Sequence, residues 1–298
     1  MKKLFLSISI TAALLAAFAG CSPKESPFFT GKGVITYYCE EPMSHKSVDI
    51  QYYIPEGDVS KMPVQFVIHG MDRNGDNYRD SWIDFADRYG CVVLVPTFDK
   101  DQFPERAYQL GNIKDSEDAP EFNAQDTLTY KIIGQVFRFF VRNTASKAKT
   151  FNIYGHSAGG QFIHRYLIFD EAKEVGKAVA ANAGWYTVPT DTIDFPYGLG
   201  KGLEFYGLDK KQYYARDLTI LLGTADTLRT SSLRQSPEAD LQGLTRLARG
   251  QYFYNYCKQD AANMGVPFNW KLEFVEGSGH SNWKMAPGGA EVIYGNKE

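Results

Sequence analysis

Residues 151–166 read FNIYGHSAGGQFIHRY, and this stretch decides the expected fold. The apolar run 151–154 is typical of a buried strand, and the apolar residues of 162–167 recur at helical spacing. Between them, residues 155–159 match the pattern G-x-S-x-G. Where a strand reverses into a helix at this pattern, glycines relieve the strained turn and the serine hydroxyl is exposed above the sheet. We therefore predict that Ser157 is a nucleophile rather than part of an ordinary glycine-rich turn.

The rest of the chain alternates strands with helices from residue 64 onward, which predicts an α/β fold with a mostly parallel sheet covered on both faces. Two alternating segments, 33–39 and 48–54, predict an antiparallel pair at one sheet edge. Residues 99–121 are charged and contain two prolines, so we expect a surface loop there. The other expected strands are 64–68, 91–95, 151–154, 175–183, 218–222 and 270–275, and the expected helices are 77–89, 125–141 and 242–264.

Four chemically useful groups directly follow expected strands. These are Ser157, Asp226, His280 and the segment His69-Gly70-Met71. In a parallel sheet of this kind the ligand binds beyond the carboxyl ends of the strands. The sequence therefore predicts that these groups converge on one edge of the sheet.

Taken together, these residues resemble the α/β-hydrolase family over roughly residues 33–290. The order Ser157, Asp226, His280 is that of the family's catalytic triad, with separations of 226 − 157 = 69 and 280 − 226 = 54 residues. The 54–78 stretch and the elbow look most similar to esterases of the polyhydroxybutyrate-depolymerase and feruloyl-esterase type. The resemblance implies an α/β-hydrolase fold and a serine esterase.

The chemistry assigns a role to each group. A serine hydroxyl needs an adjacent base, which we expect to be His280, and the resulting imidazolium needs a carboxylate, which we expect to be Asp226. The backbone N–H groups of Ala158 and Met71 are the expected oxyanion donors.

Other residues compete for these roles. Asp99 also follows a strand and Asp240 lies downstream of Asp226, so both are alternative acids. His164 lies seven residues past Ser157 on one helix, about 10 Å away, which is too far for the base. We expect a packed or solvated role for it.

Residues 184–216 interrupt the alternation with many aromatic side chains. We expect a small lid insertion over the active site, with Trp185 and Trp283 lining an acyl or alcohol pocket. The alternative is that these rings pack the insertion against the body of the domain.

The N-terminus predicts export and lipid anchoring. Residues 1–21 contain two lysines, an apolar stretch and the ending Phe-Ala-Gly-Cys, which resembles a bacterial lipoprotein signal with Cys21 as the lipidated residue. Residues 22–32 would be a tether and 33–298 the hydrolase domain. The expected location is the cell envelope, held to the membrane through the lipid anchor alone. Ordinary secretion is the alternative.

Composition excludes several classes of protein. The formal net charge is −3 with no long basic run, so we expect no nucleic-acid partner. Cys39, Cys91 and Cys257 allow at most one disulfide, and the sequence leaves all three pairings open. No cysteine or histidine spacing predicts a metal site, and the triad implies no cofactor.

The sequence therefore predicts a serine hydrolase that cleaves carboxylic esters through an acyl-enzyme, for example small-molecule esters or acyl and feruloyl groups on glycans. Two alternatives stay open. One is a peptidase or acyltransferase that uses the same triad, and the other is a non-catalytic binding lipoprotein on a hydrolase scaffold.

Overall fold

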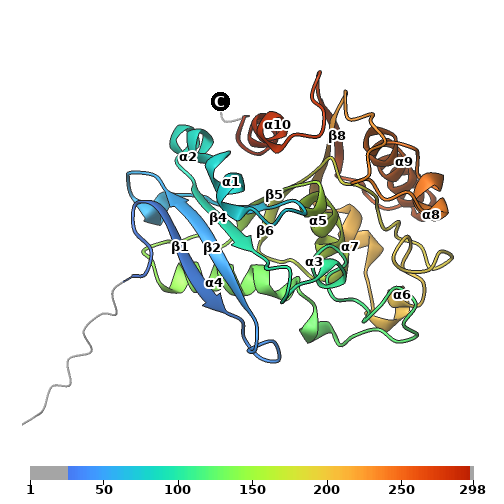
Figure 1. Ribbon diagram of the computed structural model, residues 1–298, viewed down its shortest axis with the longest axis horizontal. Helices are drawn as coiled ribbons and strands as arrows, with labels where there is room; N and C mark the ends of the chain where they lie inside the picture. The colour runs from blue at the N-terminus through green and yellow to red at the C-terminus, as the bar shows by residue number, and fades with distance from the viewer. Residues whose placement is uncertain (1–25, 296–298) are drawn as a thin grey trace, which may run out of the picture.

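The computed structural model describes residues 26–295, which form an eight-stranded sheet with helices on both faces (Figure 1). The strand order is β1-β2-β4-β3-β5-β6-β7-β8. β1 pairs antiparallel with β2, and β2 pairs antiparallel with β4, whereas every other neighbouring pair is parallel. The strands are β1 (Gly31–Tyr38), β2 (Ser47–Ile54), β3 (Val64–Ile68), β4 (Val92–Thr97), β5 (Phe151–His156), β6 (Val175–Ala181), β7 (Asp217–Gly223) and β8 (Lys271–Val275).

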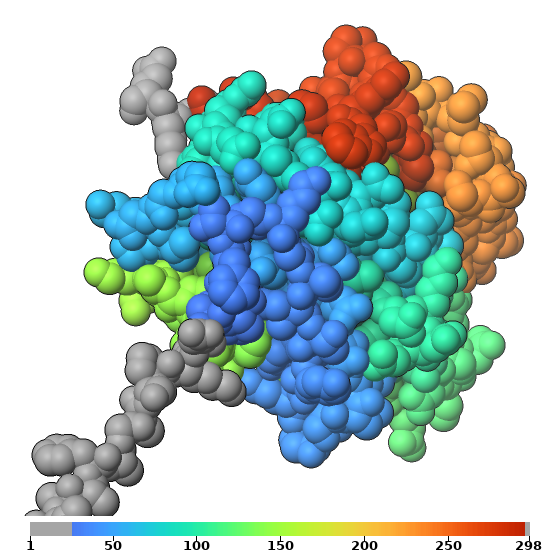
Figure 2. Space-filling model, turned by 60° about the vertical axis from the view of Figure 1, so that its left-hand side comes forward, coloured from blue at the N-terminus to red at the C-terminus, as the bar shows by residue number. Residues whose placement is uncertain are grey.

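The burial of each strand follows from its place in the sheet. All five residues of β3 are buried, because helices cover both of its faces. β1 alternates exposed with partly buried residues along most of its length, as expected for an edge strand with one face in water. Figure 2 shows this N-terminal edge in blue at the surface. The mostly parallel α/β sheet predicted from the sequence is confirmed.

Helices from both halves of the chain cover the sheet. One core packs α4, α5, α7 and α9 against one face, and a smaller core packs α1, α2 and α10 against the other. The α-helices are α1 (Gly75–Asp80), α2 (Ile83–Tyr89), α3 (Glu105–Tyr108), α4 (Lys131–Arg142), α5 (Ala158–Phe169), α6 (Gly202–Phe205), α7 (Lys210–Tyr214), α8 (Pro237–Leu241), α9 (Arg246–Met264) and α10 (Asn282–Tyr294). Two short 3₁₀ turns lie at Val59–Lys61 and Gln125–Thr127.

Three helical segments differ from the sequence expectation. The helix expected at 77–89 is two helices, α1 and α2, separated at Ser81 and Trp82, and Trp82 is fully buried against Tyr154. The helices expected at 125–141 and 242–264 begin later, at Lys131 and Arg246. α10 was not predicted.

The surface loop expected at 99–121 is irregular over most of its length, as predicted, but it is not wholly at the surface and it contains a short helix. Phe103, Tyr108 and Ile113 are fully buried, and Tyr108 belongs to the short helix α3. The charged residues of the segment face water, while its apolar residues extend the core beside the elbow helix. This arrangement brings Tyr108 next to the loop that follows β3.

The N-terminal boundary is packed. Phe28 is buried against Tyr52 and Phe140, and β1 begins at Gly31, so ordered structure starts inside the segment expected to be a tether. Residues 1–21, including Cys21, lie outside the described residues. Within the described range, no helix combines the length and apolar content needed to cross a membrane. Cys39, Cys91 and Cys257 are all buried, and no disulfide joins them.

Candidate active site

Ser157 occupies a strained turn between β5 and α5. Its backbone has φ 60° and ψ −116°, a conformation that costs a non-glycine residue about 1–3 kcal/mol. The turn also needs close packing. A Cβ at Gly159 would overlap the carbonyl oxygen of Ile68 on β3, and one at Gly155 would lie 2.5 Å from the carbonyl oxygen of Gly159. Glycine at 159 therefore lets the elbow approach β3, and glycine at 155 lets β5 and the start of α5 pack closely across the turn.

The structure brings together the three side chains that the sequence singled out. Nε2 of His280 lies 2.9 Å from Oγ of Ser157, and Nδ1 of the same ring lies 2.7 Å from Oδ2 of Asp226. Asp226 is 2% exposed, and the His280 side chain is 27% exposed. A carboxylate can only accept, so Nδ1–H of His280 donates to Asp226, and Nε2 is left to accept the proton of the Ser157 hydroxyl.

Asn182 connects the loops that carry Asp226 and His280. Its Oδ1 accepts the backbone N–H of Gly223 at 2.8 Å, and its Nδ2 donates to the carbonyl of Gly279 at 3.2 Å. Asn182 is fully buried and follows β6 with a positive φ of 44°. One amide therefore fixes the spacing between the acid loop and the histidine loop.

The loop after β3 lies beside the serine. A Cβ at Gly70 would lie 3.8 Å from Cβ of Ser157, so this loop lies within contact distance of the serine side chain. His69 holds this loop in place, because its Nε2 accepts the backbone N–H of Phe98 at 3.0 Å and its ring stacks on Tyr108 at 4.8 Å. Burial lowers the pKa of His69 to about 3. The ring is therefore a neutral structural group.

His156 packs against His280. The ring centroids of His156 and His280 are 4.7 Å apart, and Nδ1 of His156 lies 3.2 Å from the hydroxyl of Tyr78. Burial, and then the charges of His280 and Arg246, hold the pKa of His156 well below its usual range. His156 is therefore a neutral ring that buttresses His280.

A cavity of about 400 Å³ opens at Ser157 and His280. Met71 and Trp283 lie on its wall, and both side chains are exposed, whereas Ala158 is buried at the start of α5. The wall mixes polar and apolar surface and comprises Gly70, Met71, Asp72, Asn74, Asn77, Tyr78, His156, Ser157, Ser232, Arg246, His280, Asn282 and Trp283.

Trp185 does not reach this cavity. Its ring is 2% exposed and lies between two guanidinium groups, that of Arg165 at 4.3 Å and that of Arg234 at 4.9 Å from the ring centroid. The structure therefore assigns Trp185 to the packing of the 184–216 segment, which was the alternative considered for these rings.

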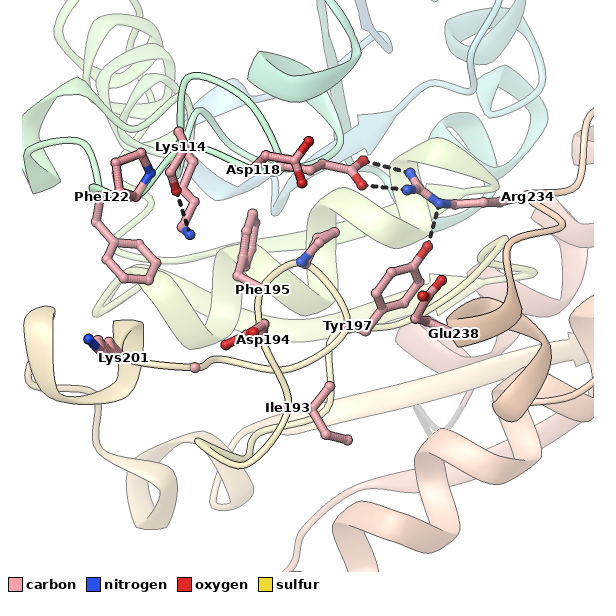
Figure 3. A pocket seen from close by; sticks show the side chains of 15 residues that line it. Lys114, Asp118, Phe122, Ile193, Asp194, Phe195, Tyr197, Lys201, Arg234 and Glu238 are labelled. Atoms are coloured by element: carbon pink, nitrogen blue, oxygen red, sulfur yellow. Dashed lines mark hydrogen bonds and ion pairs between the residues drawn. The ribbon is translucent and has the colours of Figure 1, made fainter.

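The 184–216 segment borders a second cavity instead. This cavity holds about 800 Å³ and is lined by residues 193–197, by the 114–122 loop and by Arg234 (Figure 3). No residue of 184–216 lines the cavity at Ser157. The insertion thus lies beside the catalytic cavity, and the prediction of a covering lid is not supported by these positions.

Among residues 26–295, no three acidic, histidine or cysteine side chains lie close enough to hold a metal ion. The competing catalytic residues have other partners. Asp240 pairs with Arg229 and Arg249, and His164 is fully buried on α5. Asp99 accepts backbone N–H groups of its own loop.

No family model and no curated sequence matches the chain. Among solved structures, poly(aspartic acid) hydrolase-1 from Sphingomonas sp. KT-1 has a TM-score of 0.83 and 36% identity, and the match covers 90% of this chain and 100% of that one. The chain belongs to the α/β-hydrolase family. LpqC, a poly(3-hydroxybutyrate) depolymerase from Bordetella parapertussis, has a TM-score of 0.84 and 31% identity, with 90% and 91% of the two chains covered.

Similarity at lower identity supports the fold alone. An S-formylglutathione hydrolase from Agrobacterium tumefaciens has a TM-score of 0.55 at 14% identity, covering 90% of this chain and 96% of that one. The predicted resemblance to α/β-hydrolase esterases, including a polyhydroxybutyrate depolymerase, is confirmed. The relatives also support a hydrolase in general.

Sequence reasoning missed two residues of this α/β-hydrolase site. Asn182 lies inside the strand expected at 175–183, whereas in the structure β6 ends at Ala181, so the misplaced strand end hid its position at the edge of the sheet. Arg246 begins a helix far from Ser157 in sequence, and no local pattern connects it with the cavity. Its placement depends on how α9 packs beside β7.

Proposed function

We propose that this α/β-hydrolase cleaves carboxylic esters with Ser157 as the nucleophile. The observation that carries the proposal is the continuous hydrogen-bonded chain from Oγ of Ser157 through His280 to Asp226, at the wall of a cavity. A serine hydroxyl is a poor nucleophile until a neighbouring base accepts its proton, and this chain supplies that base with a buried carboxylate behind it.

In the first step, Oγ of Ser157 bonds to the ester carbonyl carbon as its proton passes to Nε2 of His280. Asp226 stabilises the imidazolium through the 2.7 Å hydrogen bond to Nδ1. The carbonyl oxygen becomes an oxyanion, which the N–H groups of Ala158 and Met71 would stabilise. Ala158 is the first residue of α5, where backbone N–H groups have no intrahelical acceptor.

In the second step, the oxyanion collapses and the C–O bond to the alcohol breaks. His280 returns the proton to the leaving alcohol, and the acyl group stays on Ser157. A water molecule then attacks the acyl carbon while His280 accepts its proton. The second oxyanion collapses, the bond between the acyl carbon and Oγ of Ser157 breaks, and His280 returns its proton to Oγ, so the acid is released and the Ser157 hydroxyl is restored.

The relatives and the cavity wall suggest the substrate class. LpqC is named for the depolymerisation of poly(3-hydroxybutyrate), which is a polyester. Trp283 is 57% exposed on the cavity wall, where its ring is available to a substrate group. Acyl or aryl esters, including those carried on glycans, fit a cavity of about 400 Å³.

Two other acyl transfers use the same groups. The relative named poly(aspartic acid) hydrolase favours hydrolysis of an amide-linked chain as the second candidate. An acyltransferase would deliver the acyl group to an alcohol in place of water. Product analysis with an added alcohol separates transfer from hydrolysis.

The decisive experiment combines fluorophosphonate labelling with turnover of short-chain p-nitrophenyl esters. The purified protein should label and turn over, and Ser157→Ala should do neither. Ser231→Ala is the matched control, because Ser231 is an exposed serine on the loop after β7. If folded wild-type protein neither labels nor turns over, the proposal fails and the binding-lipoprotein alternative takes its place.

We also propose that the protein is a lipid-anchored protein of the cell envelope. The support is the lysine-led apolar segment that ends at Cys21. Metabolic labelling with an alkyne fatty acid should mark the wild-type protein in the membrane fraction. Cys21→Ser should lose the label, and equal labelling of both proteins would contradict the proposal.

A further inference from the structure

The cavity at Ser157 contains one buried guanidinium. Arg246 is 2% exposed, and it is the one arginine or lysine among the described residues that line this cavity. Its Nη2 donates to Oγ of Ser232 at 3.1 Å, while its buried Nε has no hydrogen-bond acceptor within residues 26–295. A buried donor without an acceptor costs about 1–3 kcal/mol, so a ligand that supplied one would be favoured.

The charge of Arg246 is only partly balanced. Its nearest carboxylate is that of Asp226, at 3.7 Å from Nη1 to Oδ1, which is beyond hydrogen-bonding distance. The other oxygen of Asp226 already accepts from His280. When His280 is protonated during catalysis, one buried carboxylate faces two cations. Among the described residues that line the cavity, Asp72 is the one with a carboxylate, and because it is exposed, water screens its charge.

The helix adds to the positive potential. Arg246 is the first residue of α9, which is 19 residues long, and the N-terminus of a helix carries a partial positive charge. An arginine there is unfavourable for the helix by itself. Leu247 donates its backbone N–H to the carbonyl of Asp226, so this helix end adjoins the acid loop. Helix dipole and guanidinium therefore act together near the catalytic cavity.

Arg234 shows the contrasting case. It lines the neighbouring cavity of about 800 Å³, but each of its three nitrogens donates to a side-chain oxygen of the protein (Figure 3). Nη1 and Nη2 pair with the carboxylate of Glu117 at 2.7 and 2.5 Å, and Nε lies 2.6 Å from the hydroxyl of Tyr197. The charge of Arg234 is thus balanced by the carboxylate of Glu117. The charge of Arg246 is only partly balanced by the protein, so an anion in the cavity could balance the rest.

We propose that Arg246 binds a carboxylate of the substrate and makes this protein selective for esters that carry a free carboxylate near the scissile bond. This inference rests on the proposed function. Arginine recognises carboxylates through two N–H groups in a fixed plane, and the pair is strong where water is excluded. The substrate carboxylate would also offset the second positive charge when His280 is protonated.

The test compares each carboxylate ester with its neutral amide of the same shape. Monomethyl glutarate against methyl 4-carbamoylbutanoate places the group on the acyl side. 3-Acetoxybutanoate against 3-acetoxybutanamide places it on the alcohol side. In the wild-type protein we expect kcat/KM for the carboxylate to exceed that for the amide by about tenfold or more in at least one pair.

Arg246→Gln should bring that ratio close to one, and Arg246→Lys should retain part of it. Because both substrates of a pair use the same triad, a ratio within one variant cancels any damage to Asp226. Arg229→Gln is the matched control and should leave the ratio unchanged. It also removes a positive charge from the segment after β7, and Asp240, which loses Arg229 as a partner, still pairs with Arg249.

A wild-type ratio of one or less in both pairs would overturn the inference, as would an unchanged ratio in Arg246→Gln. Labelling by a fluorophosphonate and turnover of neutral p-nitrophenyl esters are measured on the same preparations. If wild type is labelled and turns over the neutral esters while its carboxylate-to-amide ratio of kcat/KM is one, the inference about Arg246 fails and the proposed function stands. If wild type shows neither, the proposed function itself fails.

Discussion

The backbone N–H of Thr187 donates a hydrogen bond of 3.1 Å to Nε2 of His164. The other ring nitrogen, Nδ1, donates to the carbonyl of Gly160 at 3.1 Å. An amide N–H can only donate and a carbonyl can only accept, so the ring must be neutral. His164 thereby joins the elbow helix α5 to the 184–216 segment at a fully buried position.

Acid should lower the free energy of unfolding, because these hydrogen bonds require a neutral His164 ring. Burial holds the pKa of His164 well below its usual value, with the charge of Arg165 as a second cause, and His69 and His156 behave alike. Below about pH 6.5 the unfolded chain takes up protons that the native protein excludes, so stability falls as pH falls. We expect each buried histidine to cost about 2 kcal/mol between pH 7.5 and pH 5.

Urea unfolding at several pH values measures this slope. His164→Gln should unfold with a shallower pH dependence than wild type, whatever its stability at pH 7.5. His45→Gln is the control and should keep the wild-type slope, because the His45 side chain is exposed in the folded protein. Equal slopes for wild type and His164→Gln would show that this ring does not exclude a proton.

Asp226→Asn should abolish most activity. An asparagine in this place would donate to Nδ1 and favour the wrong tautomer of His280, and it could not stabilise an imidazolium. We expect kcat on p-nitrophenyl esters to fall by about 10⁴-fold. Asp240→Asn tests the competing acid and should stay within about tenfold of wild type. A larger loss for Asp240→Asn than for Asp226→Asn would reverse the assignment.

Gly159→Ala should destabilise the protein by about 3 kcal/mol, because the new methyl group would overlap the backbone carbonyl of Ile68 and neither element can move freely. Gly134→Ala is the matched control inside α4. Its methyl group would meet the flexible end of the Arg138 side chain, so we expect no loss or a gain of up to about 1 kcal/mol. Thermal melts compare the two, and equal melting temperatures would contradict the steric argument.

Trp185 and Trp283 should separate stability from substrate preference. Trp185→Ala removes a ring packed between two guanidinium groups and should cost about 3–5 kcal/mol, with an unchanged ratio of rates on small and bulky esters. Trp283→Ala removes a ring that is 57% exposed on the cavity wall, so the ratio should change while the melting temperature does not. The opposite pattern would return Trp185 to the substrate site.

Local sequence determined the elements on which this site depends. A glycine-flanked serine between an apolar strand and a helix leaves few conformations for residues 155–159, and the strand-helix alternation fixes a parallel sheet. Since parallel strands end at the same edge, Ser157, Asp226 and His280 could be placed together before any coordinates were known. The 2.7 and 2.9 Å hydrogen bonds between them then have an ordinary geometric cause.

Tertiary packing decided what no local pattern encodes. On an irregular segment, an aromatic residue that contacts substrate has the same sequence pattern as one that packs against protein. The burial of Trp185 against Arg165 and Arg234 could therefore not be predicted from the sequence. Residues 99–121 were expected at the surface, because charged and apolar residues are mixed there without the period of a helix or a strand.

The position of Arg246 is also a tertiary result. The residue lies 20 positions after Asp226 and reaches it because α9 begins beside the end of β7. The functional role of an arginine depends on how buried its guanidinium is and on which groups it contacts. For Arg246, both are set by segments that are distant in sequence. The sequence thus determined the fold and the order of the catalytic groups, whereas packing between separated segments decided which charges and rings surround them.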